Sequence, residues 1–340
     1  GQTWGLNLGR TTRRLLETSF WTGPLEARFR ISEYGSLTGL DLRAARRKYE
    51  VIPYALARYQ DGVEPGYEAG AELRYSPTPR DVVNATLNPD FAIIEADQEQ
   101  INLTRFELSL PEKRPFFLEG AEQYQQRIRT FYSRRVSDIH FGAKALGRRG
   151  GLAYSLLTAQ SDPSSALSTE STQSANYTVA RLETEVFRGS SVSFMAANRN
   201  LEGENRGSLG LDTSLYFTPT FNFTGQLARS HGPEEGGRWA FFVRPSRDTS
   251  TSHVHFRYTH LGDRFGDHVN AVGFIRDDNR REMDSALTKD FWVREGVVER
   301  VEYDSNYNIY WSQVNQLRSW SIDQNAGVEF KNRWAIGWSY

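Results

Sequence analysis

The sequence contains no cysteine among its 340 residues. This absence excludes thiolate metal sites, disulfide bonds and cysteine nucleophiles, and it suits a protein that crosses an oxidising periplasm. Long hydrophobic runs are also missing: 24% of the residues are charged, and no stretch approaches the roughly 18–20 apolar residues of a transmembrane helix. The formal net charge is only −1. We therefore expect neither a bundle of transmembrane helices nor a nucleic-acid-binding protein.

Aromatic residues are abundant, and many of them stand in an alternating pattern. Tyr, Phe and Trp make up 13% of the chain. In residues 300–311, Val301, Tyr303 and Ile309 alternate with polar residues such as Glu302 and Asn308. A period of two indicates a strand with one apolar and one polar face. The pattern recurs in residues 67–75, 139–146, 178–187, 209–217, 253–259 and 320–331.

The alternation predicts an all-β fold. Several runs reach the about 9–11 residues of a membrane-spanning strand, and the aromatic content suits girdles at two membrane interfaces. We predict an antiparallel transmembrane β-barrel of the bacterial outer membrane over residues 1–340, with roughly 16–18 or more strands. The alternative is a soluble β-sandwich or propeller. Soluble strands average only about 5–6 residues, and the sequence has no blade-like repeat.

The connections between these runs alternate between short and long. Short turns are expected at Arg188-Gly189 and at residues 232–237, whereas Ser161–Ser174 and Asp277–Asp284 are predicted to be external loops. The first residues contain no apolar core of a signal peptide. We therefore expect the chain to be a mature or trimmed product.

Residues 88–135, here called the inner segment, do not alternate. They combine many charges with large apolar residues such as Phe91, Ile94, Phe116 and Phe117. Because charges on a lipid-facing strand cost several kcal/mol each near the midplane (about 2–4 for Arg or Lys), the inner segment is predicted to lie inside the barrel or across its mouth. It could be a folded loop that props the barrel open or shut. It could also be a constriction that contacts a ligand through Asn88, Asp90, Glu95, Asp97, Asn102, Glu112, Lys113, Arg114, Glu119, Arg134 and Arg135.

The inner segment also carries a family resemblance. The run TLNPDFAIIEADQEQINLTRFELSLPEKRPFFLEG, followed by FYSRRV, resembles an uncharacterised group of bacterial outer-membrane proteins. In that group a family 9-like carbohydrate-binding domain precedes a C-terminal barrel. The likeness is strong over Thr86–Val136 and fair over Trp4–Ser76. It implies that the carbohydrate-binding domain of a longer protein is absent here. It also implies that the C-terminus is cut, although the alternating aromatic ending at Tyr340 favours a native last strand.

Metal binding and catalysis receive little support from the sequence. His253 and His255 lie two apart and share one strand face, a spacing that can chelate a metal, but no carboxylate fits on the same strand. No G-x-S-x-G motif is present, and carboxylate pairs such as Glu95 and Asp97 are more often bonded to arginines. We therefore expect no cofactor, no metal and no enzyme activity.

Two functions remain open, with a membrane-embedded hydrolase as a third and weaker one. The first is a channel or uptake pore for small hydrophilic solutes or oligosaccharides. The second is a structural barrel that anchors surface domains or partner proteins. The expected partners are outer-membrane lipid, an oligosaccharide and other envelope proteins.

Overall fold

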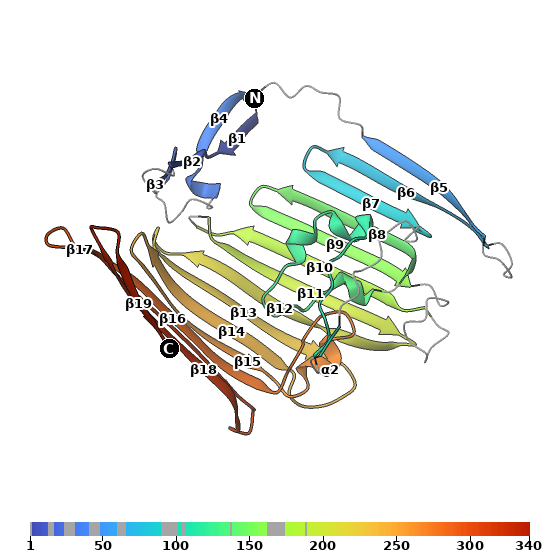
Figure 1. Cartoon of the computed structure of the whole chain (residues 1–340). Coiled ribbons are helices and arrows are strands. Elements are labelled where there is room, and N and C mark those ends of the chain that lie inside the picture. Colours follow the sequence, from blue (N-terminus) through green and yellow to red (C-terminus); the bar gives the residue numbers. More distant parts are fainter. Residues whose placement is uncertain are drawn as a thin grey trace.

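The computed structural model describes residues 2–12, 17–23, 31–40, 48–59, 66–89, 101–103, 106–136, 138–161, 174–187 and 189–340. Fifteen strands form one sheet in which each strand is bonded to the next along the chain, β5 at one edge and β19 at the other (Figure 1). Its strands are β5 (Tyr49–Arg58), β6 (Gly66–Thr78), β7 (Asp81–Leu87), β8 (Ile139–Arg149), β9 (Leu152–Ser161), β10 (Asn176–Glu185), β11 (Ser191–Leu201), β12 (Glu204–Tyr216), β13 (Phe221–His231), β14 (Trp239–Thr249), β15 (Ser252–Leu261), β16 (Arg280–Trp292), β17 (Val298–Trp311), β18 (Leu317–Phe330) and β19 (Ala335–Ser339).

Four further strands form two small antiparallel sheets outside the main one. These strands are β1 (Gln2–Leu6) with β4 (Gly35–Leu40), and β2 (Gly9–Thr12) with β3 (Glu17–Phe20). The described residues thus contain 19 strands, and every pairing among them is antiparallel. The predicted all-β antiparallel fold is confirmed.

The helices found in the described residues are few and short. They are α1 (Pro115–Leu118), α2 (Phe265–Val269) and the 3-10 turns η2 (Ile31–Glu33), η3 (Ala121–Tyr124) and η4 (Ser133–Arg135). Within the part of the chain that the structure describes, no helix has the length and apolar character needed to cross a membrane.

The main sheet has one apolar face and one polar face. Leu182 pairs with Phe194, Phe194 with Leu211, and Leu211 with Leu227, so these side chains form a row across four neighbouring strands. Such partners share a face because side chains alternate along each strand. The apolar face exposes large side chains from nearly every strand, among them Val51, Leu73, Val83, Leu156, Leu182, Phe194, Leu211, Leu227, Val254, Leu287, Tyr307, Trp320, Ile336 and Trp338.

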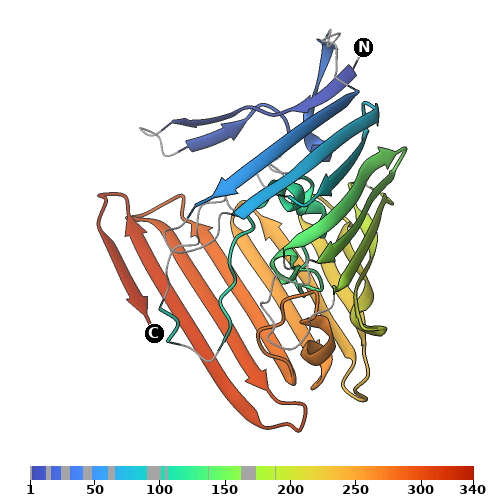
Figure 2. The ribbon, with the colours of Figure 1, turned by 90° about the vertical axis from the view of Figure 1, so that its right-hand side faces the viewer.

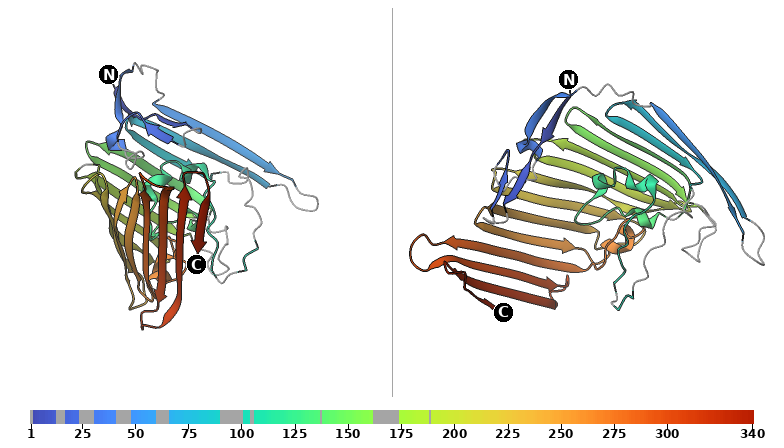
Figure 3. Two further views of the ribbon diagram at one scale, coloured as in Figure 1. Left: turned by 60° about the vertical axis from the view of Figure 1, so that its left-hand side comes forward. Right: turned by 45° about the horizontal axis from the view of Figure 1, so that its top comes forward.

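The opposite face is polar, and part of the inner segment packs on it. Residues 106–136, here called the docked segment, lie against this face on the concave side of the curved sheet (Figures 2 and 3). Two apolar cores hold it there, one on β8–β11 and one on β13–β15 with α2. The predicted interruption of the alternation is thus present in the described part of the inner segment.

The loop predicted at Asp277–Asp284 was wrong for its last five residues. The connection after β15 runs from Gly262 to Asn279 and contains α2, and β16 begins at Arg280. Arg280, Glu282 and Asp284 alternate with Arg281 and Met283 on the two faces of β16. The sequence resembles a loop there because Arg281, which shares the apolar face with Met283, is charged. The other predicted loop falls mostly on residues outside the described ranges.

The two edges of the sheet remain apart. Among the described strands, β5 pairs only with β6 and β19 pairs only with β18. The described residues therefore form an open, curved sheet, and the predicted closed barrel is not completed by them.

Candidate functional site

Aromatic packing fixes the docked segment to the sheet. Phe116, Phe117 and Tyr124 are buried against residues of β9 and β10 that include Leu157 and Tyr177. Gly142 on β8 makes room for this packing, because a Cβ atom there would come within 2.9 Å of the Phe116 ring. The apolar residues of the segment are therefore used for docking.

A buried ion pair shapes the first half of the docked segment. Arg114 Nη2 lies 2.8 Å from Glu112 Oε2, with both side chains more than nine-tenths buried. Arg114 also donates to the carbonyls of Val136 and Ser133, and its guanidinium lies 4.2 Å from the centre of the Phe117 ring. Burial acts to raise the pKa of Glu112, but the hydrogen bonds and charge of Arg114 outweigh it, so this pKa is lowered.

Polar bonds to the strands complete the docking. Lys144 of β8, itself buried, donates to the carbonyls of Phe116 and Glu119. Gln226 of β13 accepts from the backbone N–H of Ile128 at 2.9 Å and donates to the carbonyl of Ile128 at 2.8 Å. Burial raises the pKa of Tyr124, which is bonded to Ser155, to about 12. These bonds fasten the backbone of the segment to the sheet at several points, while Glu122, Gln125 and Arg127 remain exposed.

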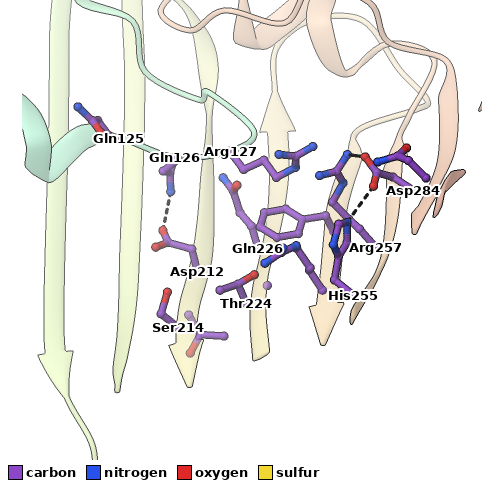
Figure 4. Close-up of a pocket in the computed structure, with 15 residues that line it drawn as sticks. Gln125, Gln126, Arg127, Asp212, Ser214, Thr224, Gln226, His255, Arg257 and Asp284 are labelled. Carbon is purple, nitrogen blue, oxygen red and sulfur yellow. Dashed lines mark hydrogen bonds and ion pairs between the residues drawn. The ribbon is translucent and has the colours of Figure 1, made fainter. Parts of the chain in front are cut away.

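A cavity of about 540 Å³ lies between the docked segment and the polar faces of β12–β17 (Figure 4). We call it the arginine cleft. Its charged lining residues are Arg127 of the segment, Arg244 of β14, Arg257 of β15, Asp212 of β12 and Asp284 of β16. Its polar lining includes Gln125, Gln126, Ser214, Thr224, Gln226, His255 and Asn306, with Phe242 as an aromatic wall.

Both carboxylates of the arginine cleft are already bonded. The Asp212 oxygens accept from Arg181 Nη1 and Nη2, each at 2.8 Å, and Asp212 also accepts from Gln126 at 2.6 Å. Asp284 accepts from Arg257 and lies 2.9 Å from His255 Nε2. Figure 4 shows the bond of Gln126 to Asp212 and the bonds of Arg257 and His255 to Asp284. The two carboxylates are thus engaged with protein donors.

Two of the three cleft arginines have no such partner. Within the described ranges, neither the Arg127 nor the Arg244 guanidinium has a hydrogen bond or an ion pair, and Arg127 only faces the Phe242 ring. Burial lowers the pKa of Arg127, as do the positive charges of Arg257 and Arg244, whereas the carboxylates of Glu282 and Asp284 oppose the shift. The net direction is downward, so burial and the two cations outweigh these carboxylates.

The register of β14 with β15 explains why Arg244 and Arg257 lie on the same face of the sheet. Phe242 pairs with Thr259 across β14 and β15, and Arg244 and Arg257 stand two residues further along the same face of these strands. Pro245 follows Arg244 and has no N–H to give to the ladder, and no pairing between β14 and β15 is formed at this point. Arg244 and Arg257 thus lie opposite each other on the polar face, and both line the cavity that Arg127 lines.

The structure separates the predicted site residues. Glu112 and Arg114 are mutual partners inside the docked segment, and Glu119 pairs with Arg74 at 2.8 Å and with Asn84. Arg135 bonds to Glu107 and to the carbonyl of Gly273. Asn88 ends the β7 region, where its side chain donates to Ala69.

The remaining predicted residues are not gathered at the cleft. Asn102 is exposed and bonds to the carbonyl of Phe106. Lys113 and Arg134 are half-buried in the docked segment. Asp90, Glu95 and Asp97 lie outside the described residues. None of the described members lines the arginine cleft.

The histidine pair has carboxylate neighbours that its own strand does not supply. His253 bonds to Asp248 of β14 and, at 2.9 Å, to His255, which bonds to Asp284 of β16. Among the described residues, no group of three or more His, Asp or Glu side chains has the arrangement of a metal site.

Sequence reasoning missed the residues of the arginine cleft. Asp212 and Arg257 belonged to polar strand faces already recognised, but nothing in the sequence distinguished them from other polar-face residues. Asp284 fell in the predicted loop at Asp277–Asp284, so its place on a strand face was not foreseen. Arg127 lies in the run QQRIRT of the inner segment, where no period or motif marks it. Only the register of β12–β17 and the docking at Gln226 could have identified them.

Part of the chain matches a known protein family model. Residues 48–147 match the model of a domain of unknown function, DUF5916, and this range contains the Thr86–Val136 motif. No curated protein matches the chain. Among solved structures, a mutant of the porin of Rh. blastica is similar, with a TM-score of 0.35 and 11% identity, over 99% of this chain and 97% of that chain.

Proposed function

We propose that the chain forms the wall of a β-barrel in the bacterial outer membrane and that the polar face lines a pore for small hydrophilic solutes. The apolar face carries this proposal. It exposes large apolar side chains such as Leu182, Phe194 and Leu211 from strand after strand. Soluble monomers rarely expose contiguous apolar patches larger than a few hundred Å² (about 300–600), whereas a spanning sheet must present one to lipid.

Strand length supports the same proposal. The strands from β8 to β18 have between 10 and 14 residues, and a tilted spanning strand needs about 9–11. In the membrane the edges of β5 and β19 must be paired, because hydrocarbon cannot bond to free N–H and C=O groups. The proposed pore therefore includes closure of the curved sheet into a barrel.

The docked segment would act as a fixed constriction of this pore. It is held by buried aromatic residues and by the bonds of Gln226 and Lys144, yet it leaves the arginine cleft between itself and the sheet. Hydroxyl and amide side chains such as Ser214, Thr224 and Asn306 line that space. Together with the resemblance to proteins that carry a carbohydrate-binding domain, this lining favours oligosaccharides or sugar-like solutes.

Single-channel conductance in planar lipid bilayers tests the proposal. The purified chain is expected to give discrete openings, and a variant with residues 106–136 replaced by a flexible linker is expected to give larger ones. A folded chain that inserts into bilayers but never conducts, with or without the docked segment, would contradict a pore. That result would leave the anchoring function, in which the docked segment is a permanent plug.

A further inference from the structure

The charges around the arginine cleft do not cancel at its surface. Three arginines and two aspartates line it, and both aspartates are held by other protein groups. Asp212 is bonded by Arg181 and Gln126, and Asp284 by Arg257 and His255. The next carboxylate along the same face of β14 from Arg244 is Asp248, which is bonded to His253. Arg127 and Arg244 thus line the cavity, and none of these carboxylates is bonded to them.

The arrangement is costly unless something binds there. Like charges in a partly buried site repel each other more strongly than in water, because the effective dielectric constant is lower. Burial, Arg257 and Arg244 lower the pKa of Arg127, and the opposing charges of Glu282 and Asp284, which are themselves bonded to Arg257, do not fully offset them. An anion seated between these groups would relieve the repulsion. It would also supply the acceptors that a planar guanidinium binds in a bidentate manner.

We propose that the arginine cleft binds a small hydrophilic anion, an organic molecule that bears one carboxylate or phosphate group together with hydroxyl groups. Arg127 and Arg244 bind the charged group. Thr224, Ser214 and Asn306 bind hydroxyl groups. This inference deepens the proposed pore by naming its solute class, and its transport part rests on that function, whereas its binding part does not.

The dimensions of the cleft fit this class. Its volume of about 540 Å³ lies within the range of about 300–1,000 Å³ typical of sites for small molecules. The buried Phe242 ring closes the wall of the cleft beside Arg127. A cation has no comparable site here, because the carboxylate oxygens of Asp212 and Asp284 are occupied by arginine, glutamine and histidine donors.

Equilibrium binding tests the inference without any need for conduction. The probes are glucuronate, inorganic phosphate and neutral glucose, titrated into the purified chain in detergent and followed by calorimetry. Glucuronate and phosphate are expected to bind at least about tenfold more tightly than glucose binds. Arg127→Gln and Arg244→Gln are each expected to weaken anion binding by about tenfold or more, since each removes a charge-assisted hydrogen bond.

Arg300→Gln is the matched control. Arg300 lies on the polar face of β17, where Asp290, Glu302 and Glu329 surround it, and it does not line the cleft. Its replacement removes the same charge and is expected to leave anion binding unchanged. An equal loss of anion affinity in Arg300→Gln and Arg127→Gln would overturn the inference, as would equal affinities for glucose and glucuronate. Heat-modifiable mobility of each variant checks that it is folded.

Conductance separates the two proposals. An anion-selective reversal potential that falls in Arg127→Gln and Arg244→Gln supports both of them. Anion binding without any conductance would leave the cleft assignment and overturn the pore. Conductance without anion binding would keep the pore and overturn the cleft assignment.

Discussion

Arg114 and Glu112 form a buried ion pair two residues apart, with Arg114 Nη2 2.8 Å from Glu112 Oε2. The same guanidinium reaches the carbonyls of Ser133 and Val136 at the far end of the docked segment. One side chain therefore connects the beginning and the end of this segment. The PEKRPFF run is better explained by this structural role than by contact with a solute.

Removing one partner of this pair is expected to destabilise the protein strongly. Arg114→Ala leaves Glu112 buried without its cation and is expected to cost about 3–5 kcal/mol of unfolding free energy. Denaturant unfolding in lipid or detergent measures this loss. Arg148→Ala is the control, since the pair of Arg148 with Glu185 is half exposed and is worth about 0–1 kcal/mol. Similar losses in the two variants would contradict a special role for Arg114.

Acid is expected to weaken the docked segment through Glu112. The pKa of Glu112 is lowered in the folded chain from its ordinary value of 4.5. Its contribution to stability is therefore fully present above that ordinary value and is lost as the pH falls through the lowered one. Unfolding free energies from neutral pH to below about pH 4 measure the effect.

A comparison of two glutamates isolates the contribution of Glu112 to this pH dependence. Glu112→Gln is expected to be less stable at neutral pH and to lose less stability on acidification. Glu235→Gln, at an exposed turn, should keep the slope of the parent chain. A slope that does not change in Glu112→Gln would argue against the assigned protonation behaviour.

Gln226 is expected to control the docking of the segment beside the arginine cleft. Gln226→Leu removes both bonds to the Ile128 backbone, and each buried group left without a partner costs about 1–3 kcal/mol. Hydrogen exchange at the Ile128 amide is expected to accelerate well beyond that at amides of β13. Gln316→Leu, at an exposed position after β17, should leave hydrogen exchange unchanged both at Ile128 and at the amides of β13. Unchanged exchange at Ile128 in Gln226→Leu would show that this contact does not hold the segment.

A charge on the apolar face is expected to block membrane assembly. Leu227 is exposed on that face of β13, and Leu227→Arg is expected to cost about 2–4 kcal/mol if it lies near the bilayer midplane. The fraction of folded, heat-modifiable protein in liposomes measures the effect. Val314→Arg changes an equally apolar but exposed residue in the connection after β17 and should assemble normally. Normal assembly of Leu227→Arg would contradict lipid contact at the apolar face.

Much of the fold was predictable because strand faces are local properties. The alternation of Val301, Tyr303 and Ile309 with Glu302 and Asn308 specifies the two faces of β17 before any partner strand is known. The interruption at the inner segment was equally visible, since Phe116 and Phe117 stand beside Glu112 and Arg114 without a period. The start of β16 was missed because Arg281 places a charge on the apolar face.

The candidate site was not predictable in the same way. Arg127 belongs to the docked segment, Arg244 to β14 and Arg257 to β15, and no local pattern links them. Their meeting depends on the register of β14 with β15 and on the two bonds by which Gln226 holds Ile128.

The sequence by itself thus determined which residues face the two sides of the sheet, because a side-chain period of two follows from backbone geometry alone. The tertiary structure alone decided which carboxylates are bonded and which arginines are left facing the cleft. Those outcomes depend on distances of a few ångströms between strands and a docked segment that are far apart along the chain.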